Sequence, residues 1–140
     1  MAVARQLASI AQVAPGRLAF GVGACGEDRD EISNAGVDPA TRGRRLDESL
    51  TVLHRLATGE PVDHDGEFFR LSGARVLPQP QPPIPVVIPG VGNAAVRRAA
   101  QHGDGWLAIS ARRFAATHAQ IVRASTEGGR KAPDWFGFTV

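Results

Sequence analysis

The chain has 140 residues, of which 43% are hydrophobic, so it can bury a core and is too apolar for a disordered chain. Its 16 Lys and Arg residues against 14 Asp and Glu residues give a formal charge of only +2, and with so few aromatic residues we expect no nucleic-acid partner. No apolar run reaches the roughly 18 residues of a membrane span. The single cysteine, Cys25, excludes an intramolecular disulfide.

The first segment is predicted to be an amphipathic helix that ends at Pro15 and Gly16. Its apolar residues recur at helical spacing: Val3, Leu7, Ile10 and Ala14. Polar residues interrupt the apolar stretch, so we interpret the segment as a helix rather than an export signal, and we expect a cytoplasmic protein with no membrane partner. A short apolar strand is predicted at residues 18–22, where it is bordered by glycines.

The middle of the chain is predicted to hold a helix and a hairpin. Residues 27–36 form a loop or short helix, and Asp38 as N-cap with Pro39 as first helical residue begins the longer helix. Apolar residues on both sides of Asp65 and Gly66 favour a small β-hairpin, and the prolines of residues 77–83 favour an extended connector. We expect residues 60–83 to be an insertion within one domain that spans residues 1–140.

The second half alternates strands with helices. The expected elements are a strand at 84–88, a helix at 93–102, a strand at 106–109, a helix at 111–126 and a strand at 135–140. Asn93 and Ser110 are the expected N-caps, and Gly103 and Gly128 the expected helix ends. This alternation predicts an α/β fold with a parallel sheet and right-handed crossovers.

Glycine-rich turns follow two of the predicted strands, at residues 21–26 and at residues 89–93. The carboxyl ends of parallel strands share one edge of the sheet, where ligands bind in α/β folds. After the second strand, bare N–H groups at a helix N-terminus suit an anionic group such as a phosphate. The alternative is ordinary turn chemistry, because glycine often follows a strand without binding anything.

Other reactive side chains have a structural interpretation beside the functional one. Cys25 is interpreted as a passive small thiol rather than a nucleophile, and the four histidines lack the spacing of metal ligands, so we expect no metal. Asp104 is interpreted as a turn residue rather than an acid or base, and Trp106 as a core residue rather than a stacking partner.

The sequence resembles the bacterial luciferase-like monooxygenase family over about residues 2–110. The shared features are GR before a glycine-ended strand, the VDP and RGRRLDE helix, the TGEPV turn and the GEFF hairpin within residues 16–71. The match continues within residues 74–107 through LPQPQPPIPVVIPGVGNAAVRRAAQHGDGWL. These features are specific in combination, although no single one is.

The resemblance implies a (β/α)8 barrel that binds coenzyme F420 or FMN at the carboxyl edge of its strands. It implies that residues 90–95 hold the cofactor phosphate, that residues 23–24 line the cofactor pocket, and that Ser110 lies near the cofactor ring. The cofactor-binding residues implied in this way are Gly23, Ala24, Gly90, Val91, Gly92, Asn93, Ala94, Ala95 and Ser110. Because Val91, Gly92 and Ala95 stand where some members have polar side chains, the contacts here would come from backbone N–H groups.

A complete barrel has about 250 residues, so the chain is expected to be a partial barrel with about four parallel strands, strands four to seven of the family, and a hairpin insertion. The family's acid/base residues lie in the earlier strands, so no catalytic residue is assigned. We expect a truncated or split oxidoreductase or monooxygenase that acts on a small-molecule substrate, either with molecular oxygen or by hydride transfer. We also expect a homo-oligomer or a complementing half-barrel, because partial barrels leave strand edges exposed. The alternatives are a non-catalytic half-barrel that serves assembly, and a half-barrel that binds a phosphosugar.

Overall fold

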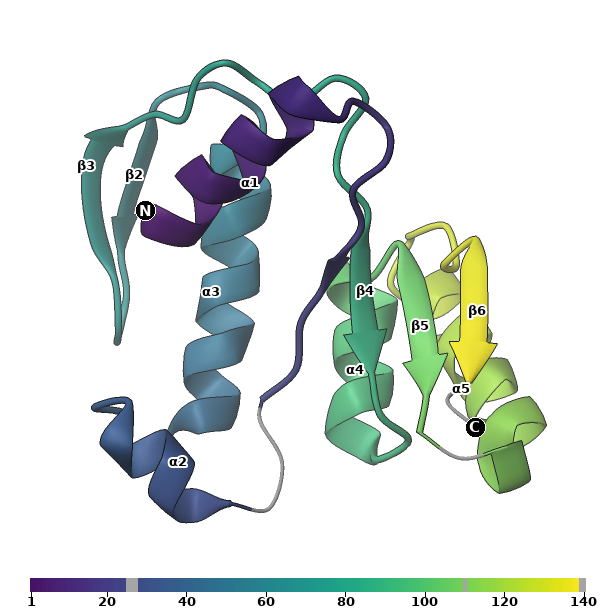
Figure 1. The fold of residues 1–140 in the computed structure, drawn as a ribbon. Coiled ribbons are helices and arrows are strands. Elements are labelled where there is room, and N and C mark those ends of the chain that lie inside the picture. Colours follow the sequence, from purple (N-terminus) through teal and green to yellow (C-terminus); the bar gives the residue numbers. More distant parts are fainter. Residues whose placement is uncertain (25–27, 110, 139–140) are drawn as a thin grey trace. The chain divides into compact units, whose positions relative to one another are not determined.

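The computed structural model describes residues 1–24, 28–109 and 111–138, and Figure 1 shows its elements. The chain divides into two compact units. Unit 1 comprises Met1–Arg17 and Ala24–Pro83, and unit 2 comprises Leu18–Gly23 and Ile84–Val140. Among the described residues, no helix combines the length and the apolar character that crossing a bilayer requires.

Unit 2 is built on a parallel sheet, which confirms the predicted α/β fold and the expected partial barrel of four strands. Its strands lie in the order β1 (Phe20–Gly21), β4 (Val86–Pro89), β5 (Gly105–Ala108) and β6 (Trp135–Phe138), and each neighbouring pair is parallel. The helices that connect the strands are α4 (Asn93–His102), the short 3-10 helix η1 (Ala111–Arg113) and α5 (Phe114–Glu127). Figure 1 shows α4 and α5 on the same face of this sheet, with β4, β5 and β6 pointing the same way.

The helix-covered face of the sheet carries the core of unit 2. Ile88, Trp106 and Phe136 lie in register across three strands, so their side chains share one face. Trp106 is fully buried, and its ring lies 5.2 Å from that of Phe114 and 6.3 Å from that of Phe136, measured between centroids. Ile121 of α5 is also fully buried. The prediction that Trp106 belongs to the core is confirmed.

The amino edge of the sheet is held together by Asp104. Its carboxylate accepts a hydrogen bond from the N–H of Val86 at 3.0 Å, and its own N–H donates to the Val86 carbonyl at 2.8 Å. The Asp104 carbonyl accepts from the N–H of Asp134 at 3.0 Å, and Arg130 lies 3.8 Å from the carboxylate. Asp104 therefore joins three strand beginnings, which supports the structural interpretation of this residue.

Unit 1 combines α1 (Ala2–Val13), α2 (Arg29–Asn34) and α3 (Arg42–Leu56) with a hairpin of β2 (Val62–Asp65) and β3 (Arg70–Ala74). The two strands are antiparallel, so the predicted hairpin is confirmed. One cluster of buried residues joins α1, α3 and the hairpin: Ala4, Ala8, Val52, Leu56, Val62 and Val76. Ala4 and Ala8 are the residues through which α1 contributes to this cluster.

The hairpin loop is anchored to α3 by the Glu48 carboxylate. It accepts hydrogen bonds from the N–H groups of Phe68 at 3.0 Å and Phe69 at 2.9 Å, and it lies 3.0 Å from Nε2 of His64. Burial raises the pKa of the Glu48 carboxyl, but the hydrogen bonds from His64, Phe68 and Phe69 lower this pKa more, so the net shift is downward. His64 of β2 thus pairs with Glu48 of α3.

Several predicted boundaries were wrong, each for a local reason. The helix predicted to begin at Pro39 begins at Arg42, because the Asp38 carboxylate accepts from the N–H of Ala40 at 2.8 Å and closes a turn. Asn93 is the first residue of α4 and does not cap it, since Gly92 holds the N-cap position. Gly103 and Gly128 do end α4 and α5, as predicted. The predicted cap Ser110 and the end of the last predicted strand lie outside the described residues.

Candidate functional site at the carboxyl edge of the sheet

The loop between β4 and α4 is fixed on both sides of Gly90. Its N–H donates to the carbonyl of Leu107 at 3.0 Å, and its carbonyl accepts from the indole Nε1 of Trp106 at 2.6 Å. Gly90 has a φ of +114°, a backbone conformation that residues other than glycine rarely adopt. The neighbouring strand therefore holds this loop in place before any ligand arrives.

Two glycines allow close packing at this edge. A Cβ on Gly90 would lie 3.0 Å from the Cβ of Ala95, and a Cβ on Gly23 would lie 3.1 Å from Cγ of Pro89. Gly23 follows β1 and Pro89 ends β4, so the two predicted glycine turns are neighbours in the structure. The sequence pattern thus placed Gly23 and the Gly90 loop correctly at one edge of the sheet.

The N-terminus of α4 is open. Gly92 holds the N-cap position without a side-chain hydrogen bond, and the first turn has no acidic residue. Nothing lies within 4 Å of a Cβ built on Gly92, and Gly92, Asn93 and Ala94 are exposed. The first N–H groups of a helix have no partner within the helix, and the helix dipole makes their surroundings positive. This end of α4 is therefore chemically suited to an anion.

The N-terminus of α2, in contrast, is capped by a side chain. The Asp28 carboxylate accepts hydrogen bonds from the N–H groups of Asp30 at 2.9 Å and Glu31 at 3.1 Å. Asp30 and Glu31 also place negative charge in the first turn. The two helices therefore present opposite surroundings to an anion, although both follow a glycine-containing segment.

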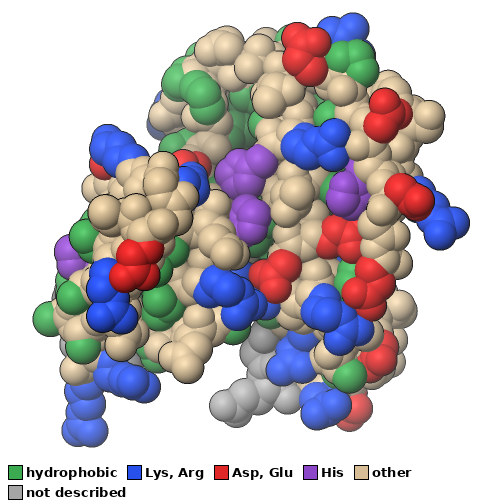
Figure 2. All heavy atoms as spheres, turned by 180° about the vertical axis from the view of Figure 1, so that it is seen from behind, with side chains coloured by type: hydrophobic (Ala, Val, Ile, Leu, Met, Phe, Trp, Pro, Cys, Tyr) green, Lys and Arg blue, Asp and Glu red, His purple; other side chains and the backbone are tan. Residues whose placement is uncertain are grey.

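The charge of the chain is unevenly divided between the units. Residues 18–23 and 84–140 hold seven Lys and Arg against three Asp and Glu, whereas residues 1–17 and 24–83 hold nine against eleven. The formal charges are thus +4 for unit 2 and −2 for unit 1, which the total of +2 conceals. Figure 2 shows basic and acidic side chains interspersed over one face. A positive balance in unit 2 favours the approach of anionic ligands to its loops.

The structure brings together only some of the expected site residues. Gly23 and residues 90–95 lie at the same edge of unit 2, with Val91 and Ala95 half-buried. Ala24 belongs to unit 1. Ser110 and Cys25 lie outside the described residues.

Trp106 is a site-supporting residue that sequence reasoning did not identify. Its burial was expected, but its indole N–H also fixes the carbonyl of Gly90. A buried indole nitrogen needs an acceptor, so a tryptophan opening a strand next to a glycine loop was the available signal. His118 lies in the same aromatic cluster, between Phe114 and Phe136. In the described part of the chain, no group of three or more His, Cys, Asp or Glu side chains is arranged to hold a metal ion.

Known proteins have sequences similar to that of this chain. The model of the luciferase-like monooxygenase family matches residues 1–135. An uncharacterized protein of Mycobacterium tuberculosis is 37% identical over 105 residues, which cover 75% of this chain and 36% of that protein. The F420-dependent glucose-6-phosphate dehydrogenase of Nakamurella multipartita is 33% identical over 132 residues, which cover 93% of this chain and 39% of the dehydrogenase.

Two solved structures superpose on most of this chain. An F420-dependent secondary alcohol dehydrogenase, in complex with an F420-acetone adduct, superposes with a TM-score of 0.83 at 25% identity, covering 97% of this chain and 43% of that one. The EDTA monooxygenase of Chelativorans sp. has a TM-score of 0.80 at 23% identity, covering 97% and 39%, and supports the fold alone. The chain spans well under half the length of the relatives that it matches. On the family match over residues 1–135, the chain belongs to the luciferase-like monooxygenase family.

Proposed function

We propose that this chain forms the phosphate-binding part of a redox-cofactor site in a luciferase-like oxidoreductase, with coenzyme F420 or FMN as the cofactor. The observation that carries the proposal is the open N-terminus of α4 behind the rigid Gly90 loop. Its N–H groups have no side-chain cap, and its first turn has no carboxylate to repel a phosphate.

The residues present fit such a cofactor through backbone rather than side chains. Gly92 leaves open space beside the first turn of α4, and Gly90 has no Cβ to push Ala95 away. The N–H groups of Asn93, Ala94 and Ala95 would hold the phosphate, and Gly23, which packs against Pro89 at the same edge, would line the cofactor pocket. Ala24 and Ser110 remain proposed cofactor-lining residues on the resemblance alone.

The cofactor, when bound, supplies the redox chemistry, either hydride transfer or reaction with molecular oxygen. The contribution of this chain is to bind and orient the cofactor. The bonds that Gly90 makes to Leu107 and Trp106 prevent the loop from relaxing, so little conformational freedom is lost when the phosphate arrives. The names of the relatives favour F420, since the Nakamurella multipartita enzyme and the secondary alcohol dehydrogenase are both F420-dependent. The substrate is proposed to be a small molecule.

A single charge added at α4 tests this proposal. Asn93→Asp nearly preserves the side-chain shape and places a carboxylate in the first turn, where it favours the helix dipole but repels a phosphate. We expect the variant to be at least as stable as the parent, and to bind F420 or FMN at least about tenfold more weakly, a loss of about 1.4 kcal/mol. Absorbance titration measures the binding, and thermal unfolding measures the stability.

The matched control is Asn34→Asp, the same change at the exposed last residue of α2. It should leave cofactor affinity unchanged. If neither cofactor binds the parent chain far above micromolar concentration, or if Asn93→Asp and Asn34→Asp bind equally well, the proposed phosphate site is wrong.

The second candidate function is a non-catalytic half-barrel that serves assembly. Within the described residues, β1 and β6 each pair with one strand only, so both edges of the four-stranded sheet carry unpaired backbone groups. A second copy or a complementing half-barrel would pair them. Sedimentation velocity with detection in the visible range separates the candidates: a dimer without chromophore favours assembly, and a cofactor-bound species of any size favours the oxidoreductase.

A further inference from the structure

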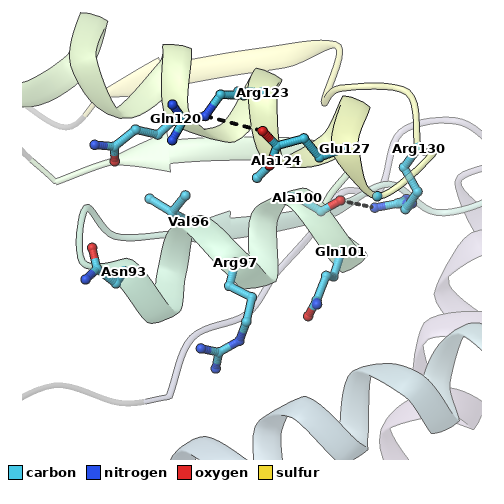
Figure 3. A pocket seen from close by; sticks show the side chains of 11 residues that line it. Asn93, Val96, Arg97, Ala100, Gln101, Gln120, Arg123, Ala124, Glu127 and Arg130 are labelled. Atoms are coloured by element: carbon cyan, nitrogen blue, oxygen red, sulfur yellow. Dashed lines mark hydrogen bonds and ion pairs between the residues drawn. The ribbon is translucent and has the colours of Figure 1, made fainter.

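A groove of about 470 Å³ lies between α4 and α5, within unit 2. Figure 3 shows Val96, Ala100 and Ala124 lying between the two helices, with Arg97 and Gln101 on the α4 side and Gln120 and Arg123 on the α5 side. The groove extends along α4 from Asn93 toward Arg130, so it leads away from the Gly90 loop. Its volume is within the usual range for small-molecule sites.

Basic side chains outnumber acidic ones in the lining of the groove. Three guanidinium groups line it, those of Arg97, Arg123 and Arg130, against the single carboxylate of Glu127. Arg130 is held in place, because it donates to the carbonyl of Ala100 at 3.2 Å and lies 3.8 Å from the Asp104 carboxylate. Its charge is therefore a fixed part of the groove.

Arg123 is held much more loosely. It lies 3.7 Å from Glu127, and both side chains are at least 70% exposed. Exposed ion pairs of this kind contribute little to stability, so the guanidinium can turn to a better acceptor at small cost. A carboxylate or phosphate can accept two hydrogen bonds from one guanidinium, which the long contact with Glu127 does not provide.

We propose that this groove binds a small amphiphilic anion. Its apolar body lies over Val96, Ala100 and Ala124, and its carboxylate or phosphate pairs with Arg123 in the positive field of Arg130. Val96 and Ala124 provide the apolar contact surface above the almost completely buried Ala100, and the glutamines at the sides offer further donors. The groove borders the proposed cofactor site at Asn93, but Arg123 and Arg130 do not belong to that site, and the test needs no cofactor.

Amide NMR of the full chain tests the groove with phenyl phosphate and octanoate as probes, and benzyl alcohol as the neutral comparison. We expect shift changes concentrated in residues 96–101 and 120–130, and binding of the neutral probe at least about tenfold weaker than that of phenyl phosphate. Arg123→Gln should weaken phenyl phosphate binding about fivefold or more, as expected when a guanidinium that pairs with the anion is removed.

Arg55→Gln is the matched control, because Arg55 is an exposed arginine near the end of α3 and does not line the groove. It should change the affinity by less than about twofold. Ala124→Phe fills the groove without changing its charge, and it should weaken both anionic probes. Equal affinities of Arg123→Gln and Arg55→Gln, or shift changes scattered over the whole chain, would overturn the proposal.

Discussion

The N-termini of α2 and α4 show how one type of structure serves two purposes. In unit 1, Asp28 caps α2, and Glu48 accepts hydrogen bonds from two amides of the hairpin loop. Side chains of the protein itself therefore bind these backbone N–H groups. In unit 2, Gly92 leaves α4 uncapped, although Trp106 and Leu107 hold the adjacent loop firmly. The lesson is that a rigid loop with unoccupied donors indicates binding, whereas a rigid loop with occupied donors indicates stability.

The largest expected effect is the loss of stability when a core side chain is truncated, which can be compared between the two units. Trp106→Ala in unit 2 should cost about 3–5 kcal/mol and Leu56→Ala in unit 1 about 2–5 kcal/mol, because both side chains are almost completely buried. The tryptophans, Trp106 and Trp135, both belong to unit 2, so their fluorescence follows that unit, while circular dichroism follows the helices of both. In urea unfolding, Trp106→Ala should move the fluorescence transition. If the units unfold separately, Leu56→Ala should move only the circular dichroism transition. If the fluorescence and circular dichroism transitions coincide in both variants, the expected single domain is supported instead.

The second effect concerns the shape of the Gly90 loop. Gly90→Val should cost about 1–3 kcal/mol from its positive φ alone, with more from the contact with Ala95, and it should abolish cofactor binding. Gly92→Ala is the matched change, because Gly92 has a φ of −81° and open space around it. Its stability cost should stay below about 1 kcal/mol. Equal losses of stability for the two variants would show that the loop is not strained at Gly90.

A third, intermediate effect lies in the hairpin anchor of unit 1. Glu48→Gln leaves one acceptor oxygen for two loop amides, so it should cost about 1–3 kcal/mol and speed hydrogen exchange at residues 62–74. Because the pKa of Glu48 is lowered in the folded state, its stabilising contribution is complete above the unfolded pKa of about 4.3 and is lost as the pH falls through the folded value. The stability difference between parent and variant should therefore shrink on acidification.

Glu67→Gln controls for the loss of a carboxylate in the same hairpin loop. Glu67 pairs with Arg44 at 2.9 Å, but both side chains are more than half exposed. We expect no measurable change in stability or in its pH dependence. A pH dependence of stability equal to that of Glu48→Gln would contradict the anchoring role of Glu48.

The smallest effect concerns the cap that distinguishes α2 from α4. Asp28→Ala should cost about 1 kcal/mol and increase amide exchange in residues 29–34, whereas Asp28→Asn should nearly keep the parent stability because Asn also caps well. Neither variant should gain affinity for phosphate, since Asp30 and Glu31 remain in the first turn. Phosphate binding by Asp28→Ala at α2 would show that removing the cap alone is enough to create an anion site.

The parallel sheet of unit 2 could be predicted because each strand is a short apolar run followed by glycine or by a helix. The run at residues 84–88 and the glycines after it sufficed to place the Gly90 loop at the carboxyl edge. Helix starts were less predictable, because Asp38 and Asn93 are residue types that both cap helices and close turns.

Contacts between distant residues were not predictable from the sequence. Glu48 and Phe69 are 21 residues apart, and Trp106 and Gly90 are 16 apart, so no local pattern announces either hydrogen bond. The uneven charge of the two units was also hidden, since residues 18–23 belong with residues 84–140 only after folding.

The way Asp104 ties three strand beginnings together has a mechanical consequence. Hydrogen bonds join the beginnings of β4 and β5 and the approach to β6 at the amino edge, so these strands should resist separation there. Because Gly90 is also bonded to Leu107 and Trp106 at the carboxyl edge, β4 and β5 are joined at both ends and should keep their spacing when a ligand binds.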